Sequence, residues 1–188
     1  SEALIAGYAS LNNNQYSDAN YFFKKVLALE SQSLAALRGM KEVEQGIIIE
    51  TINNERLLAE QSFESENFSK ALTHYQKILN LQKNIDFAVT GLNEVRVFID
   101  LEKKIDRYLD NPNRLSSRAV FLEASQVLEL ITSYNLRERL IAKKIQLSKL
   151  LNQYSKPITL VISSDNKTNI SLLNVGNLGF FSSKELKL

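Results

Sequence analysis

Cysteine is absent from this sequence of 188 residues, and histidine occurs only once. Without cysteine the chain has no disulfide framework, no thiolate metal site and no cysteine nucleophile. A single histidine cannot form a histidine cluster for zinc or iron. Glycine and proline are also scarce, with six and two residues. A β-sandwich or β-barrel needs a turn about every ten residues, so this scarcity excludes both folds and favours helices.

Charge of one sign is not in excess either, because the sequence has 23 lysines and arginines and 21 aspartates and glutamates. This balance indicates no nucleic-acid partner. One stretch, 137–156, is nevertheless basic, with only Glu138 as an acidic residue. Its cationic residues are Arg137, Arg139, Lys143, Lys144, Lys149 and Lys156. A basic helix can contact phosphate or anionic lipid, but the favoured interpretation is a solvated face above packed leucines and isoleucines.

Long hydrophobic runs are missing as well, since none approaches the roughly 18 apolar residues of a membrane span. We therefore expect no membrane span in this sequence. Both ends predict a fragment of a longer protein: a helical pattern begins almost at Ser1, and residues 185–188 alternate like a strand that has only started. A signal peptide or an anchor would then lie upstream.

What is present is helical periodicity over residues 1–154, together with an internal repeat. Shifting the sequence by 52 residues aligns apolar, glycine and charged positions without a slip. The aligned pairs include Tyr16/Phe68, Ala19/Ala71, Phe23/Tyr75, Lys25/Lys77, Ala36/Ala88, Gly39/Gly91, Val43/Val95 and Glu50/Glu102. A degraded third copy follows with a one-residue slip, at Ala124, Leu128 and Ile131. The repeat predicts stacked helix pairs that bury a shared core, with small residues such as Gly39 and Gly91 letting helices approach closely.

The two clear copies, residues 14–27 and 66–79, each place an aromatic at a turn, a small alanine three residues on and a second aromatic after that. This pattern resembles the second half of a tetratricopeptide repeat, and the resemblance covers most of residues 2–131. Asn14 and Glu66 stand where the family has a turn glycine, and Ser31 and Lys83 where it has a closing proline. The period of 52 exceeds the family's 34 by about five helical turns. We therefore expect lengthened helices within 33–65 and 85–110.

Residues 156–188 differ in composition from the rest of the chain. Lys156-Pro157 is expected to end the helices, and 158–163 and 169–175 read as strands, with 176–179 as a glycine turn and a third strand from about Lys184. Residues 157–165 and 175–181 resemble the opening of a PEGA-type β-domain, a module of bacterial envelope proteins. The predicted fold is thus mainly α. It comprises an antiparallel helix-pair repeat domain over 1–154 and the start of a PEGA-type β-domain over 157–188.

Residues that could carry chemistry are few. His74 has no acidic residue within four positions on either side, so we interpret it as structural. Paired carboxylates at i,i+2 spacing lie on different helix faces, and no phosphate-binding loop or nucleophile motif occurs. We therefore expect no enzyme, no catalytic or metal-binding residue and no cofactor. The adjacent pair Phe180-Phe181 is different, because one ring can pack inward while the other reaches a partner.

The tetratricopeptide resemblance implies a groove, lined by the first helix of each pair, that binds a protein or peptide. Positions counted from Phe68 and Ala71 give the predicted partner-binding residues Asn53, Arg56, Glu60, Phe63 and Glu64. The alternative is that the long helices close this groove by packing together. The resemblances together imply a non-enzymatic scaffold of the bacterial cell envelope, periplasmic or anchored by a segment outside this sequence. The alternative function is a structural cell-wall or surface-layer protein that binds glycan through its β-module.

Overall fold

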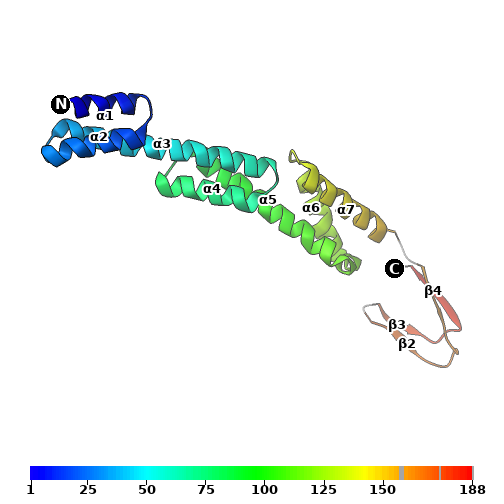
Figure 1. Cartoon of the computed structure of the whole chain (residues 1–188). Helices are drawn as coiled ribbons and strands as arrows, with labels where there is room; N and C mark the ends of the chain where they lie inside the picture. The colour runs from blue at the N-terminus through cyan, green and yellow to red at the C-terminus, as the bar shows by residue number, and fades with distance from the viewer. Residues whose placement is uncertain (157–158, 174, 188) are drawn as a thin grey trace. The chain divides into compact units, whose positions relative to one another are not determined.

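The computed structural model describes residues 1–156, 159–173 and 175–187. It has the predicted fold class: α-helices make up most of the chain, and a short antiparallel β-segment follows them (Figure 1). The chain divides into two compact units, Ser1–Asp100 and Leu101–Leu188. The division falls within a helix, α5 (Asp86–Asp110). The predicted domain limits, 1–154 and 157–188, stay a prediction.

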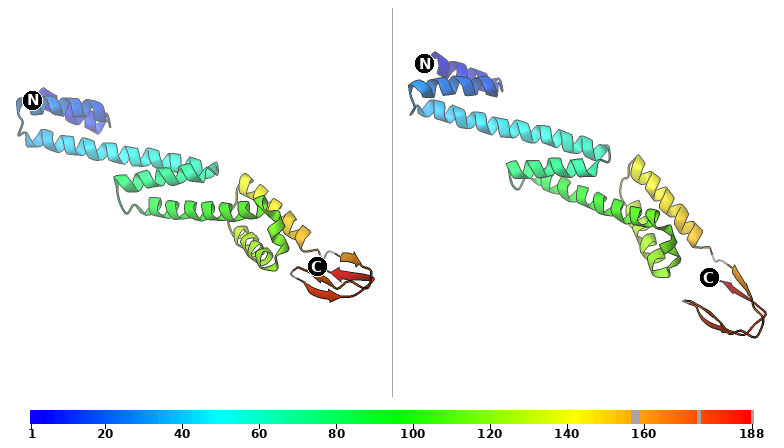
Figure 2. Two further views of the ribbon diagram at one scale, coloured as in Figure 1. Left: turned by 90° about the horizontal axis from the view of Figure 1, so that it is seen from below. Right: turned by 60° about the horizontal axis from the view of Figure 1, so that its bottom comes forward.

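The first unit contains α1 (Glu2–Asn12), α2 (Tyr16–Leu29), α3 (Leu34–Glu64), α4 (Phe68–Leu81) and the first part of α5. The helix α3 is unbroken over 31 residues, as both views of Figure 2 show. The first half of α3 packs on α1 and α2. Helix α4 also packs on α3. The lengthened helices expected within 33–65 and 85–110 are therefore confirmed.

The turns that join the helices of each pair repeat in detail. Asn14 and Glu66 both have a left-handed backbone, with φ of 57° and 55°. In the first copy Asn14 N–H donates to the Leu11 carbonyl and Gln15 N–H to the Ser10 carbonyl, and the second copy has the same two bonds 52 residues later. This pattern satisfies the free carbonyls at a helix end. The two residues that replace the family's glycine thus adopt the conformation glycine would supply.

Helix starts differ from three of the four serines expected as N-caps. From the sequence, Ser17, Ser33, Ser69 and Ser116 are expected as N-caps, because each stands at a break in the helical pattern and its hydroxyl can accept a backbone N–H bond. However, α2 and α4 begin at Tyr16 and Phe68, so Ser17 and Ser69 lie inside their first turns. The left-handed turns bring the chain into helical geometry earlier than the serines suggested. Ser33 does precede α3. Ser117, one residue after Ser116, precedes α6.

The core of the first unit is made by the repeated positions. Ala19, Phe23, Ala36 and Val43 form one buried cluster, and their counterparts 52 residues on are buried as well. A Cβ built on Gly39 would lie 2.3 Å from Cζ of Phe23, and one built on Gly91 would lie 2.3 Å from Cζ of Tyr75. These contacts confirm that the two glycines allow close helix approach.

The second unit contains the end of α5, a short 3₁₀ helix η1 (Pro112–Ser116), α6 (Arg118–Thr132) and α7 (Glu138–Tyr154). Ala124 and Ile131 of the degraded third copy are fully buried, and Leu128 packs against the same core. That core also includes Ile105, Tyr108, Leu115, Leu147 and Leu151.

Among residues 159–173 and 175–187, the structure has four strands: β1 (Thr159–Ser163), β2 (Ile170–Leu172), β3 (Gly176–Gly179) and β4 (Ser183–Lys187). They form two separate antiparallel ribbons, β1 with β4 and β2 with β3. The predicted glycine turn at 176–179 is wrong, because this segment is itself a strand paired with β2 beside a register irregularity. Gly176 and Gly179 have φ of 112° and 78°, so these glycines allow the irregular backbone of β3. The predictions at Pro157, Ile158 and Asn174 lie outside the described residues.

Candidate protein-binding surfaces

The predicted partner-binding residues lie in the second half of α3, at helical steps of three and four. Asn53, Arg56, Glu60 and Glu64 are exposed, whereas Phe63 is partly buried. Arg56 Nε donates to Glu60 Oε1 at 2.7 Å, and both side chains are about half exposed. The Arg56 guanidinium also lies 4.5 Å from the centre of the Phe87 ring on α5. The structure thus brings Arg56 and Glu60 together, but it holds Arg56 in contacts within the chain.

Phe63 belongs to an aromatic cluster that joins α3, α4 and α5. Its ring contacts Phe68 at 5.5 Å and Phe98 at 5.2 Å edge to face, and the Phe68 and Phe98 rings are stacked. Such aromatic pairs add about 0.5–1.5 kcal/mol each beyond burial. Phe63 therefore supports packing between helices, and the exposed part of the predicted surface is polar.

A polar contact that sequence reasoning missed lies between α3 and α4. Glu55 Oε2 is 2.6 Å from Nδ1 of His74, and Lys77 Nζ donates to Glu55 Oε1 at 3.2 Å. The hydrogen bond with His74 is the main reason that the pKa of Glu55 lies below its ordinary value. The partner lies 19 positions away in the chain, so a search of nearby residues could not find it. The pair ties two helices together, which agrees with a structural His74.

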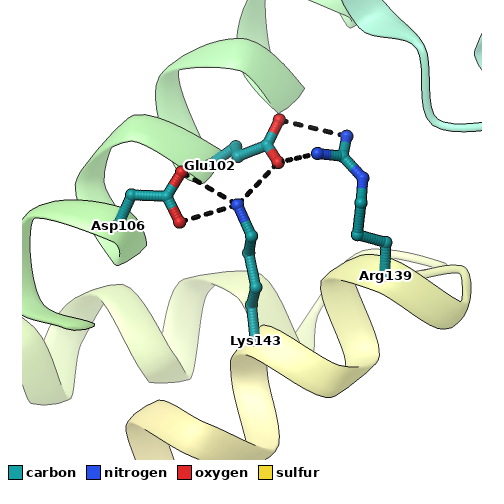
Figure 3. Close-up of polar contacts among 4 residues, drawn as sticks. All are labelled: Glu102, Asp106, Arg139 and Lys143. Atoms are coloured by element: carbon teal, nitrogen blue, oxygen red, sulfur yellow. Dashed lines mark hydrogen bonds and ion pairs between the residues drawn. The ribbon is translucent and has the colours of Figure 1, made fainter. Parts of the chain in front are cut away.

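The basic stretch 137–156 is partly neutralised by α5. Arg139 and Lys143 on α7 face Glu102 and Asp106 on α5 (Figure 3). Lys143 Nζ lies 2.8 Å from Glu102 Oε1 and 2.6 Å from Asp106 Oδ1. Burial alone would lower the pKa of Lys143, but its hydrogen bonds with Asp106 and Glu102 raise it overall. These two cations thus hold two helices of the second unit together and are engaged by carboxylates within the chain.

The adjacent aromatics of the β-segment differ in environment. The Phe180 side chain is 60% exposed, whereas the Phe181 ring lies 5.7 Å from the Lys184 ammonium. Phe180 thus offers an aromatic surface next to β3.

Within 1–156, 159–173 and 175–187, acidic, histidine and cysteine side chains form no group of three that could hold a metal ion. In the same residues no helix combines the length and the apolar character that a membrane crossing requires.

Comparison with known protein families gives a match. The family model SHNi-TPR matches residues 56–86, which span the end of α3, α4 and the start of α5. No curated protein and no solved structure matches the chain. The match falls on the second copy of the repeat and includes its packing residues Phe68, Ala71, Tyr75 and Ile78.

Together with the helical structure, this match shows a tetratricopeptide-like helical repeat. Repeats of this type are, in general, scaffolds for protein–protein interaction and typically non-catalytic.

Proposed function

We propose that this chain is a non-enzymatic scaffold of the bacterial cell envelope that binds another protein through its helical array. The tetratricopeptide-like match at 56–86 is the observation that carries the proposal. The exposed polar positions Asn53, Arg56 and Glu60 of α3 lie at or beside the matched segment. The Arg56–Glu60 pair can exchange its internal bond for charge-assisted bonds to a partner backbone or side chain.

The envelope location rests on the resemblance of residues 157–165 and 175–181 to a PEGA-type β-domain. Two antiparallel ribbons in this region are compatible with the opening of a small β-module. Ribbons of two strands are marginally stable alone. In this proposal the rest of such a module supports them.

Photo-crosslinking through one introduced cysteine tests the scaffold function. Because the sequence lacks cysteine, Asn53→Cys labelled with a maleimide benzophenone carries the only reactive group. We expect a recurrent protein adduct from an extract of the source cells. Lys70→Cys, exposed on α4, is the matched control and should not give this adduct. No adduct, or the same adducts from both positions, would overturn the binding face. An adduct with a cytoplasmic protein would overturn the envelope location.

The second candidate function is glycan binding by the β-segment, and the exposed Phe180 ring favours it. Aromatic rings at a surface supply large contact area with little loss of side-chain entropy. Co-sedimentation of the full chain with purified peptidoglycan tests this function. If the function holds, Phe180→Ser reduces the bound fraction, while Leu173→Ser, at an 89% exposed residue of the same segment, leaves it unchanged. Equal binding by both variants contradicts it.

A further inference from the structure

A second surface lies between α2 and the first half of α3, away from the predicted residues 53–64. It is a groove of about 560 Å³, within the range of specific ligand sites. Its floor is apolar and follows one stripe of α3 over about three helical turns. The groove is lined by Asn20 and Lys24 of α2 and by Leu37, Met40, Lys41, Val43, Glu44, Ile47 and Ile48 of α3.

Apolar side chains are accessible in this groove. Leu37 and Ile47 are each 44% exposed, and they lie ten residues apart on the same stripe of α3. Burying an aliphatic side chain of this size stabilises a complex by about 1.5–3 kcal/mol at most. The exposed stripe is about 16 Å long at 1.5 Å per residue, which matches three turns of a partner helix.

The rim of the groove is basic. Lys24 and Lys41 stand on opposite helices, and within the part of the chain that the structure describes neither forms an ion pair. Arg56, Arg139 and Lys143 differ in this respect, because each has a carboxylate partner. The groove contains a single acidic residue, Glu44.

Comparison of the two repeat copies shows which groove residues the repeat fold does not require. The packing positions agree between the copies, as Phe23/Tyr75 and Gly39/Gly91 show. Four groove positions, Leu37, Met40, Val43 and Ile47, also keep an apolar residue in the second copy, whereas the remaining groove positions differ. Counterparts 52 residues on are Leu72 for Asn20, Gln76 for Lys24, Asn93 for Lys41 and Asp100 for Ile48. The repeat therefore folds without the lysines and Asn20, and these residues give the first copy a charge pattern of its own.

Resting on the scaffold function proposed above, we propose that this groove binds an amphipathic helix of a partner protein, with apolar side chains on the α3 stripe and carboxylates at Lys24 and Lys41. Helix-in-groove recognition uses anchors at i, i+3, i+4 and i+7, which is the spacing of the α3 stripe. The lysines select acidic flanks and reject basic ones through electrostatic complementarity.

The only methionine of the sequence, Met40, lines this groove. Its ¹³C-labelled methyl group in the full chain therefore gives one unambiguous NMR signal. The probe is a capped 15-residue amphipathic helix of leucine and glutamate. A leucine–lysine helix of the same pattern is the comparison for charge, and a leucine–glutamate peptide without amphipathic order is the comparison for shape. We expect only the first peptide to shift the Met40 methyl signal saturably.

Substitutions locate the contact. Lys24→Gln with Lys41→Gln should weaken binding about fivefold, whereas Lys25→Gln with Lys70→Gln, at exposed lysines outside the groove, should leave it unchanged. Leu37→Ser should weaken binding about tenfold. Its repeat counterpart on α5, Val89→Ser, is a matched control because Val89 is 40% exposed. Unchanged helical circular dichroism confirms that each variant folds.

Three outcomes overturn this proposal. Equal shifts from the leucine–lysine helix show that charge is not recognised. A concentration-dependent Met40 shift without peptide, matched by dimers in sedimentation, makes a second copy the occupant. If no peptide shifts the Met40 methyl signal but position 53 gives a protein adduct, the groove proposal is wrong and the proposed scaffold function is retained. If Met40 stays silent and position 53 gives no adduct, both proposals fail.

Discussion

Two glycine positions carry much of the packing of the first unit. Gly39 and Gly91 each face an aromatic ring of the preceding helix, Phe23 or Tyr75, where a Cβ would lie 2.3 Å from the ring. Neither glycine interrupts its helix. Alanine is the better helix former by about 1 kcal/mol, so glycine here is explained by close approach to the ring.

Gly39→Ala should therefore destabilise the protein by about 1–3 kcal/mol through overpacking against Phe23, despite the gain in helix propensity. Urea unfolding followed by circular dichroism measures this change. Phe23→Leu in the same chain should recover part of the loss by removing ring atoms. Gln45→Ala, exposed on α3, is the control and should cost nothing. Equal stability of Gly39→Ala and the wild type would refute the close approach.

The contact between Glu55 and His74 gives a dependence on pH. The pKa of Glu55 in the folded chain lies below its ordinary value of 4.5, chiefly because of the hydrogen bond with His74. The ionised carboxylate thus stabilises the folded state above pH 4.5, and this contribution disappears as the pH falls through the lower folded value.

Glu55→Gln should therefore cost about 1 kcal/mol at pH 7, and less at pH 3.5, because protonation of this carboxyl in the unfolded chain below pH 4.5 removes part of the contribution. The two free energies of unfolding, measured in urea at both pH values, check this sign. Glu50→Gln, at an exposed site of α3, should show no such difference. A cost for Glu55→Gln that is equal at both pH values would contradict the pair's role.

At the scale of elements, the sequence predicted the long helices well. The 52-residue register predicted lengthened helices within 33–65 and 85–110, because five extra turns keep the same face inward. Sequence predicted the β-segment less well. Gly176 and Gly179 were interpreted as a turn because glycine usually ends strands, but strand pairing with β2 overrides that preference.

Only part of the candidate binding surface could be predicted from the sequence. Helical spacing placed Asn53, Arg56 and Glu60 on an exposed face, but contacts from distant elements decided their environment. Phe87 under Arg56 and the aromatic cluster around Phe63 come from α4 and α5. Spacing within one helix cannot predict such partners. The groove between α2 and α3 was not predicted either, because side chains from two helices form it.

The contact of α5 with α7 in the second unit is another element-scale feature. Lys143→Ala leaves the partly buried Glu102 with fewer charge partners and should destabilise the protein by about 1–2 kcal/mol. Urea unfolding measures the loss, and 1 M salt should weaken the wild type more than the variant. Lys149→Ala, exposed on α7, should have no effect. A cost for Lys143→Ala no larger than that for Lys149→Ala would contradict the contact.

For the whole molecule, the repeat predicts that the free energy of unfolding is a sum of local contributions. In stacked repeats each unit contacts mainly its neighbours, so stability is a sum of local terms. Gly39 and Lys143 belong to different compact units. Their substitutions should therefore add within about 0.5 kcal/mol in the Gly39→Ala/Lys143→Ala double variant. A coupling energy above about 1 kcal/mol would show that the two sites interact and would contradict local energetics.

At the same scale the central claim is that the helical array binds the partner. Amide hydrogen exchange of the full chain, alone and with the protein captured through position 53, tests it most directly. We predict that the partner slows exchange within 34–64, and also in α2 if the groove is occupied, while β1–β4 exchange as in the free chain. Protection confined to 159–187, with α2 and α3 unchanged, would contradict the scaffold function of the helices.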